Sequence, residues 1–193
     1  RLSLVGSEMC IRDSNLEVIG PEAQRDNMQS AAYRVIWGFL RKCPASKVRF
    51  CIFDPKEGGG SVRMLSNFVN KMPDSYKRAV TQMSRTEELL SCLKELEGQT
   101  LDFIRDRPDY DDLLDYNAHN PRRTEAITLL MLYDFPLNAD ARCLELLSSV
   151  MQKGNKCGIY VILCRNTAVE VASSYDHVDE KLAELEKNCV QIE

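Results

Sequence analysis

The stretch from Glu125 to Pro136, with the sequence EAITLLMLYDFP, constrains the fold of this chain more than any other. From Ala126 to Tyr133 it is apolar apart from Thr128, and polar and apolar residues do not alternate. A run of this length and composition is typical of a strand that is buried on both faces of a parallel sheet. The sequence therefore predicts an α/β domain with this strand at its centre.

The predicted central strand ends in an acidic residue. Asp134 directly follows the apolar run, and the carboxyl ends of parallel strands border the crevice in which α/β proteins bind ligands. Chemistry is therefore expected near Asp134. A solvated carboxylate with no role at the end of the strand is the alternative, and both interpretations stay open.

Strands and helices are predicted to alternate along the chain. Strands are expected at 16–19, 47–53, 126–133, 159–163 and 189–192. Helices are expected after Pro21, at 62–69, from a capping box at 84–87 to just before Pro108, from Asp140 to Lys153, and at 179–187. Such alternation indicates right-handed βαβ units, and hence one parallel sheet with helices on both faces.

Two of the expected helices carry long apolar stripes at helical spacing. The first stripe comprises Met28, Ala31, Ala32, Val35, Ile36, Phe39 and Leu40. The second comprises Leu89, Leu90, Leu93, Leu96, Leu101 and Ile104. Each stripe is expected to pack against the sheet.

Composition excludes several classes of protein. A chain of 193 residues can close one hydrophobic core but gives no argument for two. The net charge is -4 and there is no long basic run, so strong nucleic-acid binding by this chain alone is not expected. The longest apolar run is far shorter than the ~20 residues that a membrane span needs, so no span is expected.

The cysteines and histidines give no sign of a metal site. The eight cysteines include no C-x-x-C pair, which argues against zinc and against a disulfide framework. His119 and His177 each stand alone in polar stretches. Free, buried thiols and no metal are therefore expected.

The first fourteen residues, RLSLVGSEMCIRDS, are expected not to belong to the domain. They have neither the length nor the residue order of a signal peptide. They resemble the translated sequencing-adapter read that recurs at the ends of metagenomic gene predictions. The domain is therefore expected to span 15–193 and to be truncated at both ends.

Four segments together resemble a known family: FCIFDPKEGG at 50–59, DLLDYN at 112–117, ITLLMLYDF at 127–135 and GIYVILCRN at 158–166. In this order and spacing they resemble the P-loop ATPase domain of the FtsK/SpoIIIE family, ring-forming motors that pump DNA or drive protein secretion. The resemblance implies a three-layer, RecA-like P-loop NTPase fold. The five expected strands, numbered along the chain, would then lie in the order 5-1-4-3-2.

The same resemblance implies cofactors, partners and a location. Members of the family use ATP and Mg²⁺. The expected partners are sister ATPase domains of the same polypeptide or ring, and a protein client is a further expected partner. The family is cytoplasmic, and any association with a membrane would come from segments upstream of this chain.

The phosphate-binding loop of the family is degenerate here. Its pattern, G-x-x-x-x-G-K-[ST], supplies backbone amides and a lysine to the phosphates and a hydroxyl to magnesium. Counting from Gly20 the chain reads GPEAQRDN, which puts Arg25 at the second glycine, Asp26 at the lysine and Asn27 at the hydroxyl. Pro21 also lacks an amide proton. No bound nucleotide or metal is therefore expected.

The Walker B end of the central strand allows two alignments. If the Asp-Glu-Phe of the family is aligned on Phe135, Tyr133 replaces the magnesium aspartate and Asp134 shortens the catalytic glutamate. If it is aligned on Asp134, Phe135 replaces that glutamate. Arg165 and Asn166 stand where the family has Thr-Gln. These positions are therefore interpreted as vestigial, and no catalytic residue is assigned.

The sequence thus predicts a degenerate ATPase-like domain of a larger motor, with hydrolysis lost and a structural or partner-binding role. The crevice beside Gly20, Asp134 and Arg165, or the face around it, is one expected interface with another domain or a client protein, and a passive spacer without a partner there is the alternative to that interface. The alternative is an active ATP-binding motor domain of a DNA translocase that is completed by upstream or neighbouring-subunit residues.

Overall fold

A computed structural model describes residues 15–56, 70–169 and 178–192 of the chain. Residues 1–14 and the helix predicted at 62–69 lie outside these ranges, as does His177.

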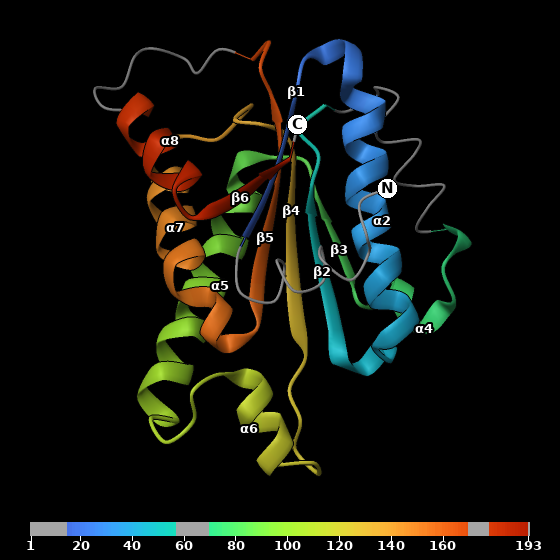
Figure 1. Ribbon diagram of the computed structural model, residues 1–193, viewed down its shortest axis with the longest axis vertical. Coiled ribbons are helices and arrows are strands. Elements are labelled where there is room, and N and C mark those ends of the chain that lie inside the picture. The colour runs from blue at the N-terminus through green and yellow to red at the C-terminus, as the bar shows by residue number, and fades with distance from the viewer. Residues whose placement is uncertain (1–14, 57–69, 170–177, 193) are drawn as a thin grey trace.

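Six strands form one parallel sheet (Figure 1): β1 (Asn15–Gly20), β2 (Val48–Phe53), β3 (Val80–Met83), β4 (Ile127–Phe135), β5 (Ile159–Asn166) and β6 (Cys189–Ile192). Their order is β3-β2-β4-β5-β1-β6, and all neighbouring pairs are parallel. Without β3, this is the predicted order 5-1-4-3-2 read from the other edge. The prediction of an α/β fold with a parallel sheet is confirmed.

The edge strand β3 was not predicted. It has four residues, and it pairs with β2 from Phe50↔Val80 to Phe53↔Met83. Thr81 and Gln82 in its middle are exposed, and only Met83 is fully buried. A strand at the edge of a sheet with exposed side chains does not need an apolar run. The sequence of β3, VTQM, therefore lacks the pattern that predicts β4.

Helices cover both faces of the sheet and make three layers (Figure 1). The helices are α2 (Arg25–Lys42), α4 (Asp74–Lys77), α5 (Thr86–Asp106), α6 (Leu113–His119), α7 (Ala141–Lys153) and α8 (Val178–Glu186). Short 3₁₀ turns lie at η1 (Glu22–Gln24), η2 (Ala45–Lys47) and η3 (Gly154–Cys157). Helix α2 lies on one face, and α5, α7 and α8 lie on the other, while α6 lies beyond the amino end of β4.

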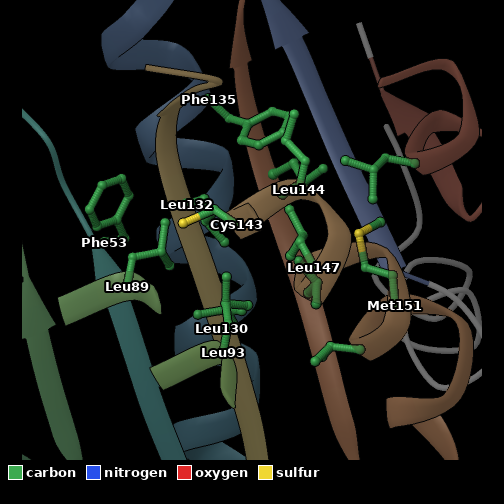
Figure 2. Close-up of a cluster of buried hydrophobic side chains, with 14 of the residues drawn as sticks. Phe53, Leu89, Leu93, Leu130, Leu132, Phe135, Cys143, Leu144, Leu147 and Met151 are labelled. Atoms are coloured by element: carbon green, nitrogen blue, oxygen red, sulfur yellow. The ribbon is translucent and has the colours of Figure 1, made fainter. Parts of the chain in front are cut away.

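Two apolar clusters, one on each face, hold the layers together. On the α2 face, Met28, Ala32 and Ile36 pack against β1, β2, β4 and β5. On the other face, side chains of α5 and α7 meet Leu130 and Leu132 of β4 (Figure 2). Leu129 to Leu132 each expose 1% or less of their surface, so the central strand is buried on both faces as its sequence predicts.

The apolar stripe predicted on α5 is partly wrong. Leu89, Leu93 and Leu96 are buried, but Leu101 is 51% exposed and Ile104 is 40% exposed. The buried positions in the last turns are Thr100 and Phe103 instead. Thr100 can be buried because its hydroxyl donates to the carbonyl oxygen of Leu96 at 2.8 Å.

The predicted capping box of α5 is displaced by one residue. The carboxylate that accepts the free amide protons belongs to Glu88, not Glu87: its Oε2 lies 3.0 Å from the amide nitrogen of Ser84 and 3.2 Å from that of Arg85. The helix therefore begins one residue later than the S-x-x-E pattern at 84–87 predicts.

The seven cysteines in the described ranges are all free thiols. Within those ranges no group of three or more His, Cys, Asp and Glu residues is placed to hold a metal ion. No described helix combines the length and the hydropathy needed to cross a membrane.

The contrast between buried and exposed leucines of α5 can be tested by truncation. Leu93→Ala removes a fully buried side chain, and the free energy of unfolding should fall by about 2–5 kcal/mol in urea denaturation. Leu101→Ala, on the exposed side of the same helix, is the matched control and should change it by less than about 0.5 kcal/mol. Equal losses would contradict the packing of α5.

Candidate functional site

A cluster of charged and polar side chains lies at the carboxyl edge of the sheet, where the strands of such folds present ligand-binding residues. Asp134 and Asn166 come from the last residues of β4 and β5. Asp54 and Lys56 follow β2, whereas Glu22 and Arg25 come from the turn between β1 and α2. We call these six residues the charged cluster: Glu22, Arg25, Asp54, Lys56, Asp134 and Asn166.

The strongest contact of the charged cluster joins Arg25 to Asp134. Arg25 Nε donates to Oδ1 of Asp134 at 2.8 Å and lies 2.9 Å from its Oδ2, and Nη2 also donates to Oδ2. The Asp134 side chain is fully buried, and that of Arg25 is 13% exposed. A fork of donors on a carboxylate away from water is among the strong hydrogen-bonded pairs in proteins. Arg25 therefore neutralises a charge that could not stay buried alone.

Lys56 and Asn166 complete the shell around Asp134 and tie it to Glu22. Lys56 Nζ lies 3.1 Å from Asp134 Oδ1 and 2.9 Å from Glu22 Oε2. Asn166 Nδ2 donates to Asp134 Oδ1 at 3.1 Å and to a carboxylate oxygen of Glu22. Both Asp134 oxygens are therefore occupied by donors from this chain.

Asp54 is the least satisfied member of the charged cluster. Its Oδ1 accepts from the amide of Lys56 at 3.3 Å and lies 3.7 Å from Arg25 Nη2. Its Oδ2 is buried without a hydrogen-bond partner among the described groups. Burial raises the pKa of Asp54 above its ordinary value of 3.8.

The pKa of Asp134 moves the other way. Burial by itself would raise it, but the hydrogen bonds from Arg25 and Asn166 and the charge of Arg25 outweigh burial and hold the pKa below 3.8. The hydrogen bond to Asp134 likewise raises the pKa of Arg25. Asp134 is therefore ionised, and its counter-ion is a residue of the same domain.

The turn between β1 and α2 does not present free amides in the way that a phosphate loop does. The amide of Gln24 donates to the carbonyl oxygen of Pro21 at 2.8 Å, and that of Arg25 donates to Glu22. Pro21 has no amide proton. A Cβ on Gly20 would lie 2.7 Å from Met28 Sδ, so α2 packs closely on the end of β1. Two amides of the turn are therefore already used within it.

The residues of this edge do not fit ATP and magnesium. With every group ionised, three carboxylates face two cations, which leaves the charged cluster with a net charge of about -1 before any phosphate arrives. Asp26 and Asn27, which the resemblance would align with the lysine and the hydroxyl of a phosphate loop, are both exposed on the first turn of α2. A triphosphate would meet repulsion rather than a cradle of donors.

The other residues singled out from the sequence lie elsewhere. Tyr133 is 2% exposed and packs on the α2 face, with its ring 6.2 Å from that of Tyr33. Arg165 pairs with Glu17 at 3.6 Å and with Glu186 of α8. Because successive strand residues point to opposite faces, Arg165 lies on the α8 face while Asn166 joins the charged cluster. Arg165 therefore does not line the crevice beside Asp134.

Sequence reasoning missed Asp54 and Lys56 as members of the site. The signal was present, because the predicted order placed the strand ending before Asp54 next to the central strand. Carboxyl ends of neighbouring parallel strands meet at one edge, and Asp54 and Lys56 follow that end directly.

The comparisons with known proteins support the fold alone. No family model matches the chain, and no curated protein does. Solved structures match at probability 1.00, among them a conjugation coupling protein, TcpA, in a monomer form with ATPγS, which has a TM-score of 0.62 at 11% identity. The match covers 91% of this chain and 47% of that one.

Two further structures match to a similar extent. The cytoplasmic domain of EssC has a TM-score of 0.61 at 15% identity, covering 94% of this chain and 33% of that one. The cytoplasmic domain of the type VII secretion ATPase EccC of Thermomonospora curvata has a TM-score of 0.62 at 14% identity, covering 92% and 20%. The chain thus has the fold of FtsK/SpoIIIE-type ATPases and spans less than half the length of each of these structures.

The ion pair between Arg25 and Asp134 can be tested by removing one partner. Arg25→Ala leaves a buried carboxylate without its main donor, and the free energy of unfolding should fall by about 3 kcal/mol in urea denaturation. Arg34→Ala, an exposed arginine on the same helix, is the control and should change it by less than about 0.5 kcal/mol.

A second substitution separates charge burial from lost packing. Adding Asp134→Asn to Arg25→Ala removes the orphaned charge, so at least half of the lost free energy should return. If Arg25→Ala behaves like Arg34→Ala, the pair does not hold this edge together.

Proposed function

We propose that this chain is a non-hydrolysing ATPase-like domain of a larger motor of the FtsK/SpoIIIE type, which serves by packing against sister domains or by binding a protein partner. The observation that carries this proposal is the Arg25–Asp134 pair. An arginine of the domain itself occupies the carboxylate at the end of the central strand.

Electrostatics at this edge favour the loss of nucleotide binding. A carboxylate about 4 Å from a phosphate oxygen costs on the order of 4 kcal/mol at an effective dielectric constant near 20. The exposed amino end of a helix stabilises a nearby negative charge by only ~0.3 to 1 kcal/mol. The two cations of the charged cluster already serve Asp134 and Glu22, so a nucleotide would have to break these pairs before it could use them.

Sister domains are the partners that the comparisons favour. Matching structures of EssC from Geobacillus thermodenitrificans and of EccC from Thermomonospora curvata contain ATPases 2 and 3, so those proteins carry several ATPase domains. This chain covers 31% and 28% of those two chains, as one domain of such an array would. We infer that it belongs to a polypeptide or ring with other ATPase domains.

Titration with a fluorescent ATP analogue and Mg²⁺ tests the lost activity. The chain should show no saturation below about millimolar nucleotide and no hydrolysis above the background without protein, because lysine and hydroxyl are both absent from the loop. Micromolar binding would contradict the proposal. It would favour instead an active motor domain that upstream residues or a neighbouring subunit complete.

A triple substitution provides the matched gain of function. Arg25→Gly, Asp26→Lys and Asn27→Thr together restore three positions of the loop and should tighten nucleotide binding at least tenfold over the parent chain. Arg25→Ala alone vacates Asp134 without supplying donors, so it should not. If the single substitution binds as well as the triple, the missing lysine is not what prevents binding.

If the domain binds a partner, we expect the interface to include the exposed first turn of α2, next to the charged cluster. Asp26 and Asn27 are exposed on this first turn and do not belong to the charged cluster. The double substitution Asp26→Arg with Asn27→Arg therefore changes the charge of this surface and leaves the charged cluster intact. In the full-length polypeptide, the dissociation constant of the assembly, measured by sedimentation, should rise about tenfold or more. Lys94→Glu on the exposed side of α5 is the control and should leave the dissociation constant unchanged. If the double arginine variant also leaves it unchanged, there is no interface at this surface.

A further inference from the structure

A broad groove runs beside the edge strand β3, on the α5 face of the sheet and away from the charged cluster. It has a volume of about 1210 Å³ and is lined by β2, β3, the outer side of α5 and the segment before β4. On this face α5 packs against Leu130 and Leu132 of β4. The described helices leave the neighbouring part of β2 and β3 uncovered, because Arg49 and Thr81 line the groove and are exposed.

The backbone of β3 is paired on one side. The carbonyl oxygens of Ala79 and Met83 accept hydrogen bonds from amides of β2 and of the residue after it, at 2.8 and 2.9 Å. In a parallel pair, residues whose backbone groups face the partner alternate with residues whose groups face away. The amides and carbonyls of Val80 and Gln82 therefore point outward. Of the described strands, β3 is the last at this edge, so none of them pairs with these groups.

The groove extends to this free edge. Three residues line it from the α5 face of β3: Ala79, Thr81 and Met83. Gln82 also lines it, although the alternation of side chains places Gln82 on the other face. Gln82 is exposed and Val80 is half-buried. Open backbone donors and acceptors of this kind are a template for the addition of another strand.

The groove carries an excess of negative charge. Its charged lining comprises five carboxylates and three arginines: Glu88, Glu95, Asp102, Asp106, Glu125, Arg49, Arg78 and Arg107. The arginines gather at one end, since they belong to the start of β2, to the segment before β3 and to the end of α5. The other end of the groove lies beside the first half of α5.

The surplus negative charge lies along that first half of α5. The helix ends where Arg107 Nη1 donates to Glu125 Oε2 at 2.8 Å, just before β4, so its first turns lie at the carboxyl edge of the sheet. Glu88 caps the helix there. Glu95 accepts a hydrogen bond from Gln99 at 2.9 Å, and within the described ranges it contacts no cation. Glu95 is therefore the carboxylate with which a basic group in the groove can pair.

We propose that this edge binds an extended, basic segment of a partner protein, which adds as a strand to β3 and directs a lysine or arginine across the groove to Glu95. Hydrogen bonds to the backbone of Val80 and Gln82 hold the segment, and the cation gives the preference for a basic sequence. Its side chains on the α5 face stand beside those of β3 that line the groove. The site is separate from the charged cluster and does not depend on the loss of hydrolysis.

Fluorescence anisotropy with labelled peptides tests the charge preference. The probe is a short peptide in which lysine alternates with threonine, and it should bind the chain saturably. The matched peptide with glutamate in place of lysine should bind at least about tenfold more weakly, because it would meet Glu95 with a like charge. Equal binding of the two peptides, or saturation by neither, would overturn the proposal.

Methylation of the peptide backbone tests the addition of a strand. In an added strand, alternate amides face β3 and the others face solvent. One isomer of the lysine peptide carries N-methyl groups on its lysines, and the other carries them on its threonines. One isomer should keep most of its affinity, whereas the other should lose about tenfold or more. Isomers of equal affinity would show that the peptide does not pair with β3.

A substitution in β3 tests the same contact from the side of the protein. Gln82→Pro removes an outward amide proton and leaves the hydrogen bonds to β2 in place. The dissociation constant of the lysine peptide should rise about tenfold, while the Tm of the chain changes by only a few degrees. Gln82→Ala keeps the amide and is the control. If both variants bind the peptide as the parent chain does, the free edge of β3 is not the site.

A substitution in α5 tests the acidic wall of the groove and leaves β3 unchanged. Glu95→Lys should weaken the lysine peptide about tenfold and tighten the glutamate peptide. Glu97→Lys makes the same change of charge on the same helix, outside the groove lining, and should do neither. Equal effects of the two substitutions would reduce the preference to the net charge of the chain and overturn the assignment of Glu95.

Discussion

One buried negative charge organises the carboxyl edge of this sheet. β4 is apolar and enclosed on both faces, so the carboxylate at its end, Asp134, reaches the crevice without water around it. An isolated carboxylate in such a place is costly, and it persists only if it is paired and hydrogen-bonded. Arg25, Lys56 and Asn166 meet this requirement. Through them Asp134 fixes the start of α2, the end of β5 and the segment after β2.

The same arrangement shows how this edge of the fold is held together by groups of the domain itself. In a P-loop the donors at this edge are left open for a ligand, and the fold must tolerate them unpaired. Here Arg25, which stays charged at any physiological pH, gives the carboxylate a permanent counter-ion. The turn also uses the amides of Gln24 and Arg25 for itself. These contacts pair the groups at this edge within the domain.

The sequence predicts most of the fold because its strongest signals are long. The run at 126–133 determines the central strand, and the alternation of elements determines the parallel sheet and its order. Short elements and elements buried on one side have weaker sequence patterns. The sequence therefore does not predict β3, and it wrongly assigns Leu101 and Ile104 to the buried side of α5. Positions at 20–27 predict the loss of the phosphate loop, but which partner Arg25 takes depends on contacts across 109 residues. Periodicity cannot reveal such contacts.

Strand β2 contributes to both faces of the sheet and to the charged cluster. Its alternation sends Phe50 and Ile52 to the α2 face and Cys51 and Phe53 to the α5 face. Asp54, which directly follows the strand, lies on the α2 side near Arg25. Because β2 is held between β4 and β3, pairing on both of its sides fixes the position from which Asp54 reaches the charged cluster.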